Sequence, residues 1–200
     1  MAAIKFGVAQ RPKHGQKIPG DAVFIHDAQA PDAPCRQVLV AVVDGLGSGE
    51  TAAQVSSQAV DCIKDNLNAP LKMLIEQCHL ALRGSRGAAM MVMRVDLAAN
   101  QVSFVGVGNV GVRAHSVSGV HPVSKNGTLG YRLPKLKEFS YNYTPGDLFV
   151  LFSDGVSNHF SLDERDISPV DFRDNPQGLA EAIINRYGKD DDDITAAVVW

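Results

Sequence analysis

The sequence has 200 residues, 45% of them hydrophobic, and a formal net charge of −3. A chain of this length can bury a sizeable core, so we expect residues 1–200 to form a single domain. The slight acidity argues against nucleic acid or an anionic membrane as a partner, and no apolar run reaches the roughly 18 residues of a membrane-spanning helix. The N-terminus lacks an apolar signal core, and Cys35, Cys62 and Cys78 form no close pair. We therefore expect a cytoplasmic protein with reduced thiols.

The first half of the chain combines two apolar strands with two amphipathic segments. The expected elements are strands over 22–25 and 38–44 and helices over 48–67 and 70–84. A Pro-rich turn at 31–34 separates the two strands. Ser48 is a candidate N-cap for the first helix, Pro70 starts the second, and Gly84 ends it.

The second half is mostly β-structure and closes with one helix and one strand. The expected elements are strands over 90–96, 101–107, 110–115, 120–123 and 148–153, a helix over 176–187 and a strand over 194–200. A four-residue hairpin loop joins the first two of these strands, and Asn175 is placed to cap the helix. This segregation of strands and helices predicts an α+β fold in which sheets pack together and helices lie outside.

Carboxylates recur at the ends of the apolar strands. Asp44 and Gly45 end the run 38–44, and Asp154 follows the run that starts at residue 148. Asp21 opens a third strand, and the acidic stretch 190–193 precedes the last one. A buried carboxylate is costly to desolvate unless it is compensated, and hard cations with oxygen ligands are the usual compensation. The pattern predicts one acidic metal-binding pocket.

The same segments match a known family in order along the chain. They are Gly20-Asp21, Asp44-Gly-Leu-Gly-Ser-Gly49, Ser153-Asp-Gly155 and Asp192-Asp-Ile-Thr195, with Arg86-Gly-Ala-Ala89 and Val107-Gly-Asn-Val110 between them. They resemble the motifs of PP2C-type (PPM) Ser/Thr phosphatases, above all the compact bacterial branch that includes the sporulation and stressosome phosphatases. The resemblance covers nearly the whole chain. It implies a four-layer α-β-β-α sandwich of two packed antiparallel sheets flanked by helices.

The resemblance also implies a metal centre and a reaction. Two Mn²⁺ or Mg²⁺ ions would share a water that attacks phosphorus directly. Asp44 would bridge both ions, Asp21 and the Gly45 carbonyl would serve one of them, and Asp154 and Asp192 would serve the other. The register of the acidic run leaves Asp193 as an alternative to Asp192. Asp44, Asp154 and Asp192 would thus act through this water.

The implied substrate is phosphoserine or phosphothreonine on a partner protein. The family branch points to a stressosome scaffold or an anti-sigma-factor antagonist. We expect the enzyme to be a monomer. Few residues separate the strand at 120–123 from the strand that ends before Asp154, so we expect little of a covering flap and an open site. Such a site favours a phosphorylated side chain on a folded protein over an enclosed metabolite.

Two positions depart from the family pattern. Leu46 stands where related eukaryotic phosphatases carry a histidine that protonates the leaving group, so the general acid is unassigned. Asn109 stands where the family has an aspartate that helps to hold a third metal ion. Asparagine is neutral and a weaker ligand, so third-metal catalysis of the familiar kind is not expected here.

Two other functions compete with catalysis. Gly45, Gly47 and Gly49 lie between a strand and a helix, as in a dinucleotide-binding loop, but their spacing is not the Gly-x-Gly-x-x-Gly of that loop. A pseudophosphatase that only binds a phosphoprotein is the other alternative, against which the intact carboxylates argue. Six basic residues either lie in contact with solvent only or form a docking surface for a phosphorylated substrate. They are Arg83, Arg86, Lys125, Arg132, Lys135 and Lys137.

Overall fold

The structure is a computed structural model that describes residues 4–28, 37–173 and 175–200. Its strands are β1 (Phe6–Arg11), β2 (Asp21–Asp27), β3 (Gln37–Gly45), β4 (Ala88–Asp96), β5 (Gln101–Val107), β6 (Gly111–His115), β7 (Phe139–Asn142), β8 (Leu148–Phe152) and β9 (Ile194–Val199). Its helices are α1 (Gly49–Asp65), α2 (Leu71–Ala81), α3 (Pro176–Tyr187) and the short 3₁₀ helix η1 (Pro169–Phe172). The turn expected at 31–34 and Cys35 lie outside the described residues. Across the described ranges, every helix is too short or too polar to cross a bilayer.

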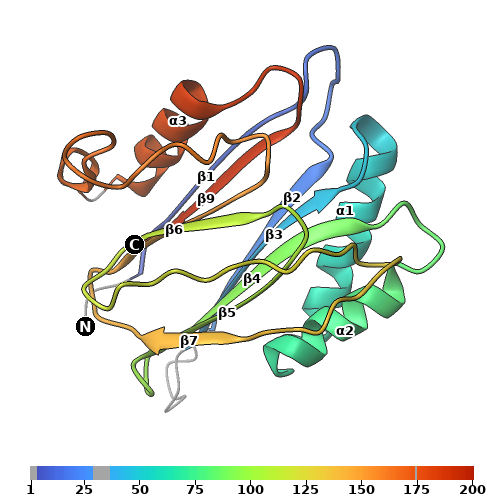
Figure 1. Cartoon of the computed structure of the whole chain (residues 1–200), viewed down its shortest axis with the longest axis horizontal. Helices are drawn as coiled ribbons and strands as arrows, with labels where there is room; N and C mark the ends of the chain where they lie inside the picture. Colours follow the sequence, from blue (N-terminus) through green and yellow to red (C-terminus); the bar gives the residue numbers. More distant parts are fainter. Residues whose placement is uncertain (1–3, 29–36, 174) are drawn as a thin grey trace.

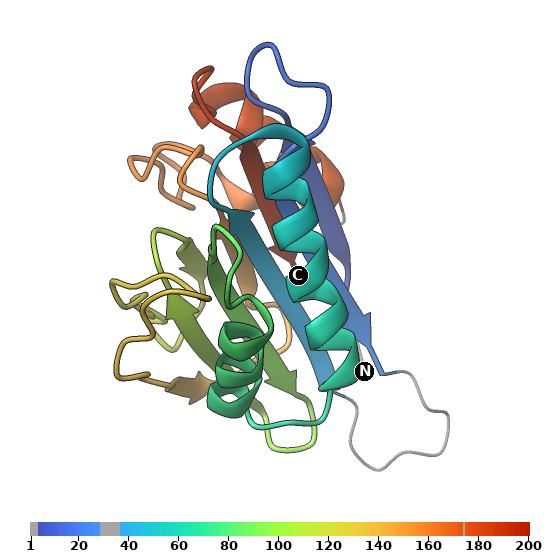
Figure 2. The same cartoon turned by 90° about the vertical axis from the view of Figure 1, so that its right-hand side faces the viewer.

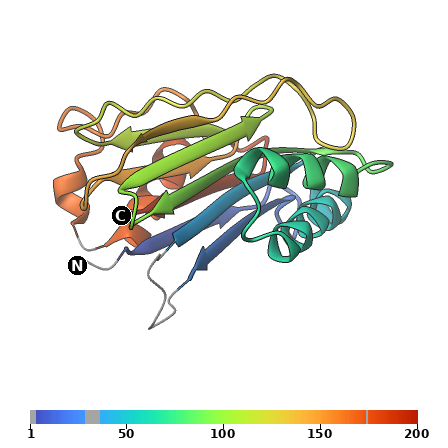
Figure 3. The same ribbon diagram turned by 90° about the horizontal axis from the view of Figure 1, so that it is seen from below.

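The strands form two antiparallel sheets that pack face to face. One sheet has the order β1-β9-β8-β6 and the other has the order β2-β3-β4-β5-β7. The helices α1 and α2 cover the outer face of the second sheet, and α3 covers the outer face of the first (Figures 1, 2 and 3). The four-layer α-β-β-α sandwich expected from the sequence motifs is therefore confirmed.

The central strand β3 explains why its sequence is apolar without interruption. Val38, Val40 and Val42 point into the core between the two sheets. Leu39 and Val43 point the other way, into the core beneath α1 and α2. A strand buried on both faces needs no polar alternation, because neither face meets water. This burial fixes β3 and the carboxylate near its end.

Side chains from both sheets pack together in the core between them, and this packing fixes the distance between the sheets. Phe104 of β5 and Phe149 of β8 meet edge to face with ring centroids 5.7 Å apart. Both side chains are fully buried, and they come from different sheets. Aromatic pairs in this geometry stabilise a core beyond the area that they bury.

The structure differs from the sequence-based expectation at the sheet edges. The strand expected at 120–123 is wrong, because these residues lie in the long loop between β6 and β7. The edge strands β1 and β7 were not expected. Both lack an apolar run, since β1 reads FGVAQR and β7 reads FSYN, and each pairs with a single neighbouring strand. Pairing with a core strand, rather than local hydrophobicity, makes these segments β-structure.

The helix ends follow the expectation within a few residues. Helix α1 ends at Asp65 and α2 at Ala81, slightly earlier than the apolar periodicity indicates. The side chain of Asn175 accepts a hydrogen bond from the Gly178 N–H at 2.9 Å, which confirms its role as the N-cap of α3. Ser48 occupies the N-cap position of α1, but its side chain makes no capping hydrogen bond.

Candidate active site

Asp21 and Asp44 lie side by side at one end of the β2–β3 pair. Asp21 is the first residue of β2, and its Cα is the register partner of the Cα of Asp44 near the end of β3. Directly opposed residues on antiparallel strands have Cβ atoms about 5 Å apart on the same face of the sheet. The two carboxylates are therefore forced into proximity by strand pairing alone.

Asp154 and Asp192 approach the same place from the other sheet. Asp154 follows β8 and Asp192 lies two residues before β9, and these strands are neighbours. Two hydrogen bonds fasten the strand ends: Ser153 donates its N–H to the Thr195 carbonyl at 3.1 Å, and Thr195 donates its N–H to the Ser153 hydroxyl at 3.0 Å. A Cβ on Gly155 would lie 2.0 Å from the Asp193 carbonyl oxygen, so only glycine permits this close approach.

The electrostatics show that these carboxylates act on one another. The pKa of Asp44 is raised to about 8, first by burial and then by repulsion from Asp21, Asp154, Asp192 and Asp193. Burial likewise raises the pKa of Asp21 to about 6, although hydrogen bonds from side chains oppose the shift. The pKa of Asp192 is raised by burial and by Asp154. Like charges from both sheets thus meet in one acidic cluster, which we define as Asp21, Asp44, Asp154, Asp192 and Asp193.

The donor set of the acidic cluster fits hard divalent cations. Within the described ranges, no group of three or more His, Cys, Asp or Glu side chains is arranged so that it could hold a metal ion as it stands. Two carboxylate oxygens of the cluster nevertheless have unused capacity, because Asp21 Oδ2 and Asp193 Oδ2 are buried without a hydrogen-bond partner in the described structure. Oxygen-only ligands suit Mg²⁺ or Mn²⁺, and a cation would relieve both the repulsion and the unpaired oxygen of Asp21.

Helix α1 supports the backbone of the acidic cluster from behind. A Cβ on Gly45 would come within 2.3 Å of the Ala52 carbonyl oxygen, so the end of β3 packs directly against the helix. The Ser56 hydroxyl donates a hydrogen bond to the Gly20 carbonyl, next to Asp21. The glycines of the two motifs are therefore required for close packing of the strand ends on α1.

Asp192 and Asp193 have different surroundings, which bears on the alternative that the sequence left open. Asp193 is only 3% exposed, and its Oδ1 accepts a hydrogen bond from the Lys13 N–H at 2.8 Å. Asp192 is half-buried, and its Oδ1 accepts the Asp193 N–H at 2.9 Å. Asp192 is the better placed of the two to face Asp154, whereas Asp193 has one oxygen tied to the loop after β1.

Polar neighbours hold Asp154 in place. Asn109 donates a hydrogen bond from its Nδ2 to Asp154 Oδ2. Lys189 donates from its Nζ to the Asp154 carbonyl oxygen at 2.5 Å. Asn109 was identified from its motif, whereas Lys189 and the backbone contact of Lys13 were not. The position of Lys189 immediately before the acidic run was the one clue to its role.

Arg86 lies over the loop that follows β3. A Cβ on Gly47 would come within 2.8 Å of one guanidinium nitrogen of Arg86, and Gly47 has a positive φ of 111°. The Leu46 N–H donates to the Gly87 carbonyl at 2.9 Å and fixes the two loops together. An exposed guanidinium thus stands at the rim next to the motif that carries Asp44. Leu46 itself is 38% exposed and offers no ionisable group.

The dinucleotide-binding alternative is wrong for this loop. The segment Gly45–Gly49 does join a strand to a helix, but β3 is antiparallel to both of its neighbours, β2 and β4. A dinucleotide-binding loop belongs to a parallel βαβ unit. Among the basic residues considered for substrate docking, Lys137 lies with its Nζ 4.4 Å from the centre of the Phe139 ring.

Comparison with known proteins agrees with the fold and with the motifs. Residues 34–199 match the family model described as Stage II sporulation protein E (SpoIIE). The chain belongs to the SpoIIE family. It is also 31% identical over 152 residues to the phosphoserine phosphatase RsbX of Bacillus subtilis (strain 168), an alignment that covers 75% of this chain and 73% of RsbX.

Solved structures give the same result. One, described as "The bacterial stressosome: a modular system that has been adapted to control secondary messenger signaling", contains a chain 29% identical to this one, with a TM-score of 0.87 and full coverage of both chains. The crystal structure of RsbX in complex with magnesium is 25% identical and has a TM-score of 0.82, with 98% of this chain and 94% of that chain covered. Family and fold identify the protein as a PP2C-type phosphatase, as its motifs predicted.

Proposed function

We propose that this protein is a metal-dependent protein serine/threonine phosphatase that acts on a phosphoprotein of bacterial stress signalling. The observation that carries the proposal is the acidic cluster, to which both sheets contribute at one end of the sandwich. The likeness to RsbX, a phosphoserine phosphatase, and to a chain of a stressosome structure supports the reaction and the pathway. The substrate we favour is a stressosome scaffold or an anti-sigma-factor antagonist.

We propose that two Mn²⁺ or Mg²⁺ ions bind the acidic cluster. Asp44 would contact both ions, Asp21 and the Gly45 carbonyl would hold one, and Asp154 and Asp192 would hold the other. When bound, the ions supply an activated water nucleophile and neutralise charge on the phosphoryl oxygens. The magnesium in the RsbX structure supports a divalent cation in this family.

The chain's own residues position this centre and its substrate. Asn109 and Lys189 orient Asp154 from two sides through hydrogen bonds. Arg86 is placed to bind the phosphoryl group at the rim, because a guanidinium fork matches phosphate oxygens. Leu46 cannot donate a proton to the departing serine or threonine oxygen, so solvent is the proton source that we propose.

Metal removal and restoration tests the reaction. Protein treated with a chelator should lose hydrolysis of 4-nitrophenyl phosphate, and added Mn²⁺ should restore it. Calorimetric titration of the same sample should show two bound Mn²⁺ ions per chain. Full activity in demonstrably metal-free protein would contradict the proposed chemistry.

Substrate choice needs a separate measurement. Phosphate release from purified phosphorylated stressosome scaffold and anti-sigma-factor antagonist proteins should exceed release from free phosphoserine and from phosphotyrosine peptides. An equal or better kcat/KM on free phosphoserine, with no turnover of the folded proteins, would leave the metal chemistry intact but reject the phosphoprotein substrate.

A further inference from the structure

A cavity of about 570 Å³ lies at the end of the β1-β9-β8-β6 sheet opposite to the acidic cluster. Strands β1 and β9 define the two ends. At one end Arg11 pairs with Ile194, next to Asp193, and at the other Phe6 pairs with Val199, next to Trp200. A six-residue strand such as β9 spans roughly 20 Å, so the cavity is well separated from the proposed active site.

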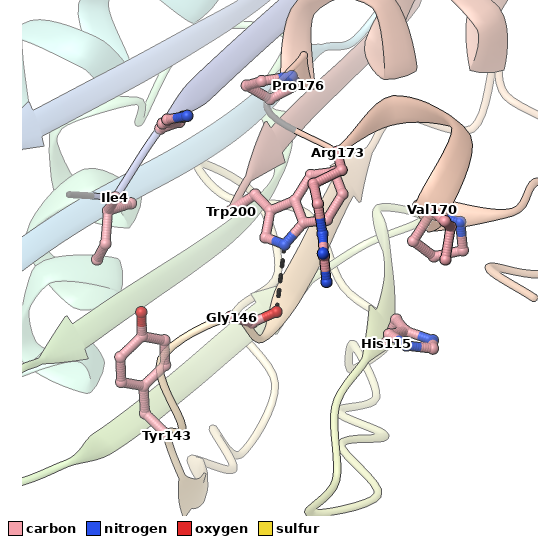
Figure 4. Close-up of a pocket in the computed structure, with 10 residues that line it drawn as sticks. Ile4, His115, Tyr143, Gly146, Val170, Arg173, Pro176 and Trp200 are labelled. Atoms are coloured by element: carbon pink, nitrogen blue, oxygen red, sulfur yellow. Dashed lines mark hydrogen bonds between the residues drawn. The ribbon is translucent and has the colours of Figure 1, made fainter. Parts of the chain in front are cut away.

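The charged side chains among the described residues that line this cavity are cationic. The described lining residues are Ile4, Lys5, His115, Tyr143, Gly146, Pro169, Val170, Arg173, Pro176 and Trp200. Of these, Lys5 and Arg173 are permanently cationic, and none of the described ones is acidic, although the chain carries a net charge of −3. Figure 4 shows Arg173 and Trp200 in the middle of the view, with His115 and Val170 on one flank and Tyr143 and Ile4 on the other. A cationic side chain such as that of Arg173 favours an anionic ligand over a cationic one.

Hydrogen bonds organise the walls of the cavity in advance. The indole Nε1 of Trp200 donates to the Gly146 carbonyl at 3.2 Å, and the Trp200 N–H donates to the Lys5 carbonyl at 2.9 Å. His115 donates from its Nδ1 to the Leu162 carbonyl at 3.1 Å, because a carbonyl can only accept. This bond leaves His115 Nε2 as the free ring nitrogen. The aromatic wall is thus fixed before any ligand arrives.

Apolar side chains form the rest of the cavity wall, and some of them are exposed to solvent at its rim. Ile4 and Tyr143 are buried in its wall, whereas Val170 of η1 is 70% exposed at the rim. A volume of this size is typical of small-molecule sites, which combine apolar walls with a few convergent polar groups. An indole face accepts a planar ring, and a guanidinium binds an oxyanion in a bidentate manner.

We propose that this cavity binds a small organic anion, namely a planar body of one or two fused rings that carries a sulfonate, carboxylate or phosphate. Arg173 binds the anionic group and Trp200 packs against the ring. The ligand occupies the opposite end of β9 from Asp192, so it does not compete with a phosphorylated substrate for the acidic cluster.

The sequence provides a direct reporter, because Trp200 is the single tryptophan. In the ¹⁵N-labelled full chain its indole N–H gives one NMR cross-peak. Naphthalene-1-sulfonate should shift this peak saturably, and the neutral analogue 1-naphthalenemethanol should bind at least about tenfold more weakly, because it lacks the charge-assisted contact. No saturable shift, or equal affinity for the two probes, would overturn the proposal.

Two matched variants distinguish binding in the cavity from non-specific attraction of the sulfonate to positive charge. Arg173→Gln should weaken sulfonate binding roughly tenfold and leave binding of the neutral probe unchanged. Arg165→Gln removes an exposed arginine that does not line the cavity, and it should bind the sulfonate as the wild type does. An equal loss in both variants would refute the role of Arg173. The sulfonate should also leave KM for 4-nitrophenyl phosphate unchanged, and competitive inhibition would place it at the acidic cluster instead.

Discussion

Asp21 and Asp44 are register partners on adjacent antiparallel strands, and both carboxyl pKa values are raised, to about 6 and about 8. Burial is the larger cause for each, and the neighbouring carboxylates add to it. The strand pairing that forms the sheet therefore brings the carboxylates of Asp21 and Asp44 together, although they repel each other once ionised. This repulsion lies at the position where we propose that cations bind.

The first prediction is a pH dependence of stability in the metal-free protein. Each of these two groups has a pKa in the folded state above its value in the unfolded chain, so ionisation costs more in the folded state. The free energy of unfolding should therefore fall as pH rises from about 4, and level off above about 8. Urea denaturation in chelator at pH 5 and pH 8.5 measures this difference.

Two controls accompany this measurement. Asp44→Asn removes the group with the larger shift, so the variant should be more stable than the wild type at pH 8.5 and show a flatter profile. Saturating Mn²⁺ should remove most of the pH dependence in the wild type, because the cation neutralises the cluster. A wild-type profile that rises toward pH 8.5 without metal would contradict the electrostatic account.

The second prediction concerns catalysis by the same residue. Asp44→Asn should lower kcat/KM for 4-nitrophenyl phosphate by at least about 100-fold, the scale for loss of one central electrostatic group. Asp191→Asn is the matched control, because this aspartate belongs to the same acidic run but is exposed. Circular dichroism should show the same fold in both variants. Near-wild-type turnover by Asp44→Asn would reject the site.

The third prediction decides between the two candidate ligands of the acidic run. Asp192→Asn should weaken metal binding and turnover strongly, because its carboxylate faces Asp154. Asp193→Asn should have a smaller effect, since the amide oxygen can still accept the Lys13 N–H. Calorimetry with Mn²⁺ measures both. The reverse order of effects would make Asp193 the ligand.

The fourth prediction uses the hydrogen bond from Asn109 to Asp154. Asn109→Asp replaces the donor with a second carboxylate, so the metal-free variant should be less stable than the wild type. With metal it should gain affinity or an additional bound ion, because a carboxylate is a better ligand than an amide. Asn109→Ala removes the donor without adding charge and should show no such gain. Unchanged stoichiometry and affinity in Asn109→Asp would argue against a latent site.

The fifth prediction concerns Arg86 at the rim. Arg86→Ala should raise KM for phosphoprotein substrates roughly tenfold and weaken inhibition by inorganic phosphate, because a guanidinium–phosphate contact is lost. Arg86→Lys should recover part of the effect, whereas Arg83→Ala, a change at an exposed residue three positions earlier, should leave KM unchanged. A fall in kcat with unchanged KM and unchanged phosphate inhibition would point to a purely structural role.

Much of the fold could be predicted from the sequence because its core strands are buried on both faces. The runs that became β3, β8 and β9 are continuous, and the carboxylates at their ends were found with them. The edge strands β1 and β7 could not be predicted, since their β-structure comes from pairing with a distant segment. Val120 is buried but lies in a loop, so apolar character alone gave a false strand there.

The acidic cluster was predictable in composition but not in its detailed contacts. Asp21 and Asp44 were identified from adjacent glycines and strand ends, and pairing then placed them together. The different surroundings of Asp192 and Asp193 depend on a backbone N–H from Lys13, which no side-chain pattern reveals. The contact of Lys189 with the Asp154 carbonyl likewise arises only when the end of α3 meets the end of β8.

The carboxylates of the acidic cluster come from different sheets, with Asp21 and Asp44 on one and Asp154 and Asp192 beside strands of the other. Cations that bind them all would link the two sheets, so metal affinity would depend on the distance between the sheets. The Phe104–Phe149 contact, which joins the sheets in the core, would then contribute to that affinity. Core packing would accordingly help to determine how tightly the acidic cluster binds metal.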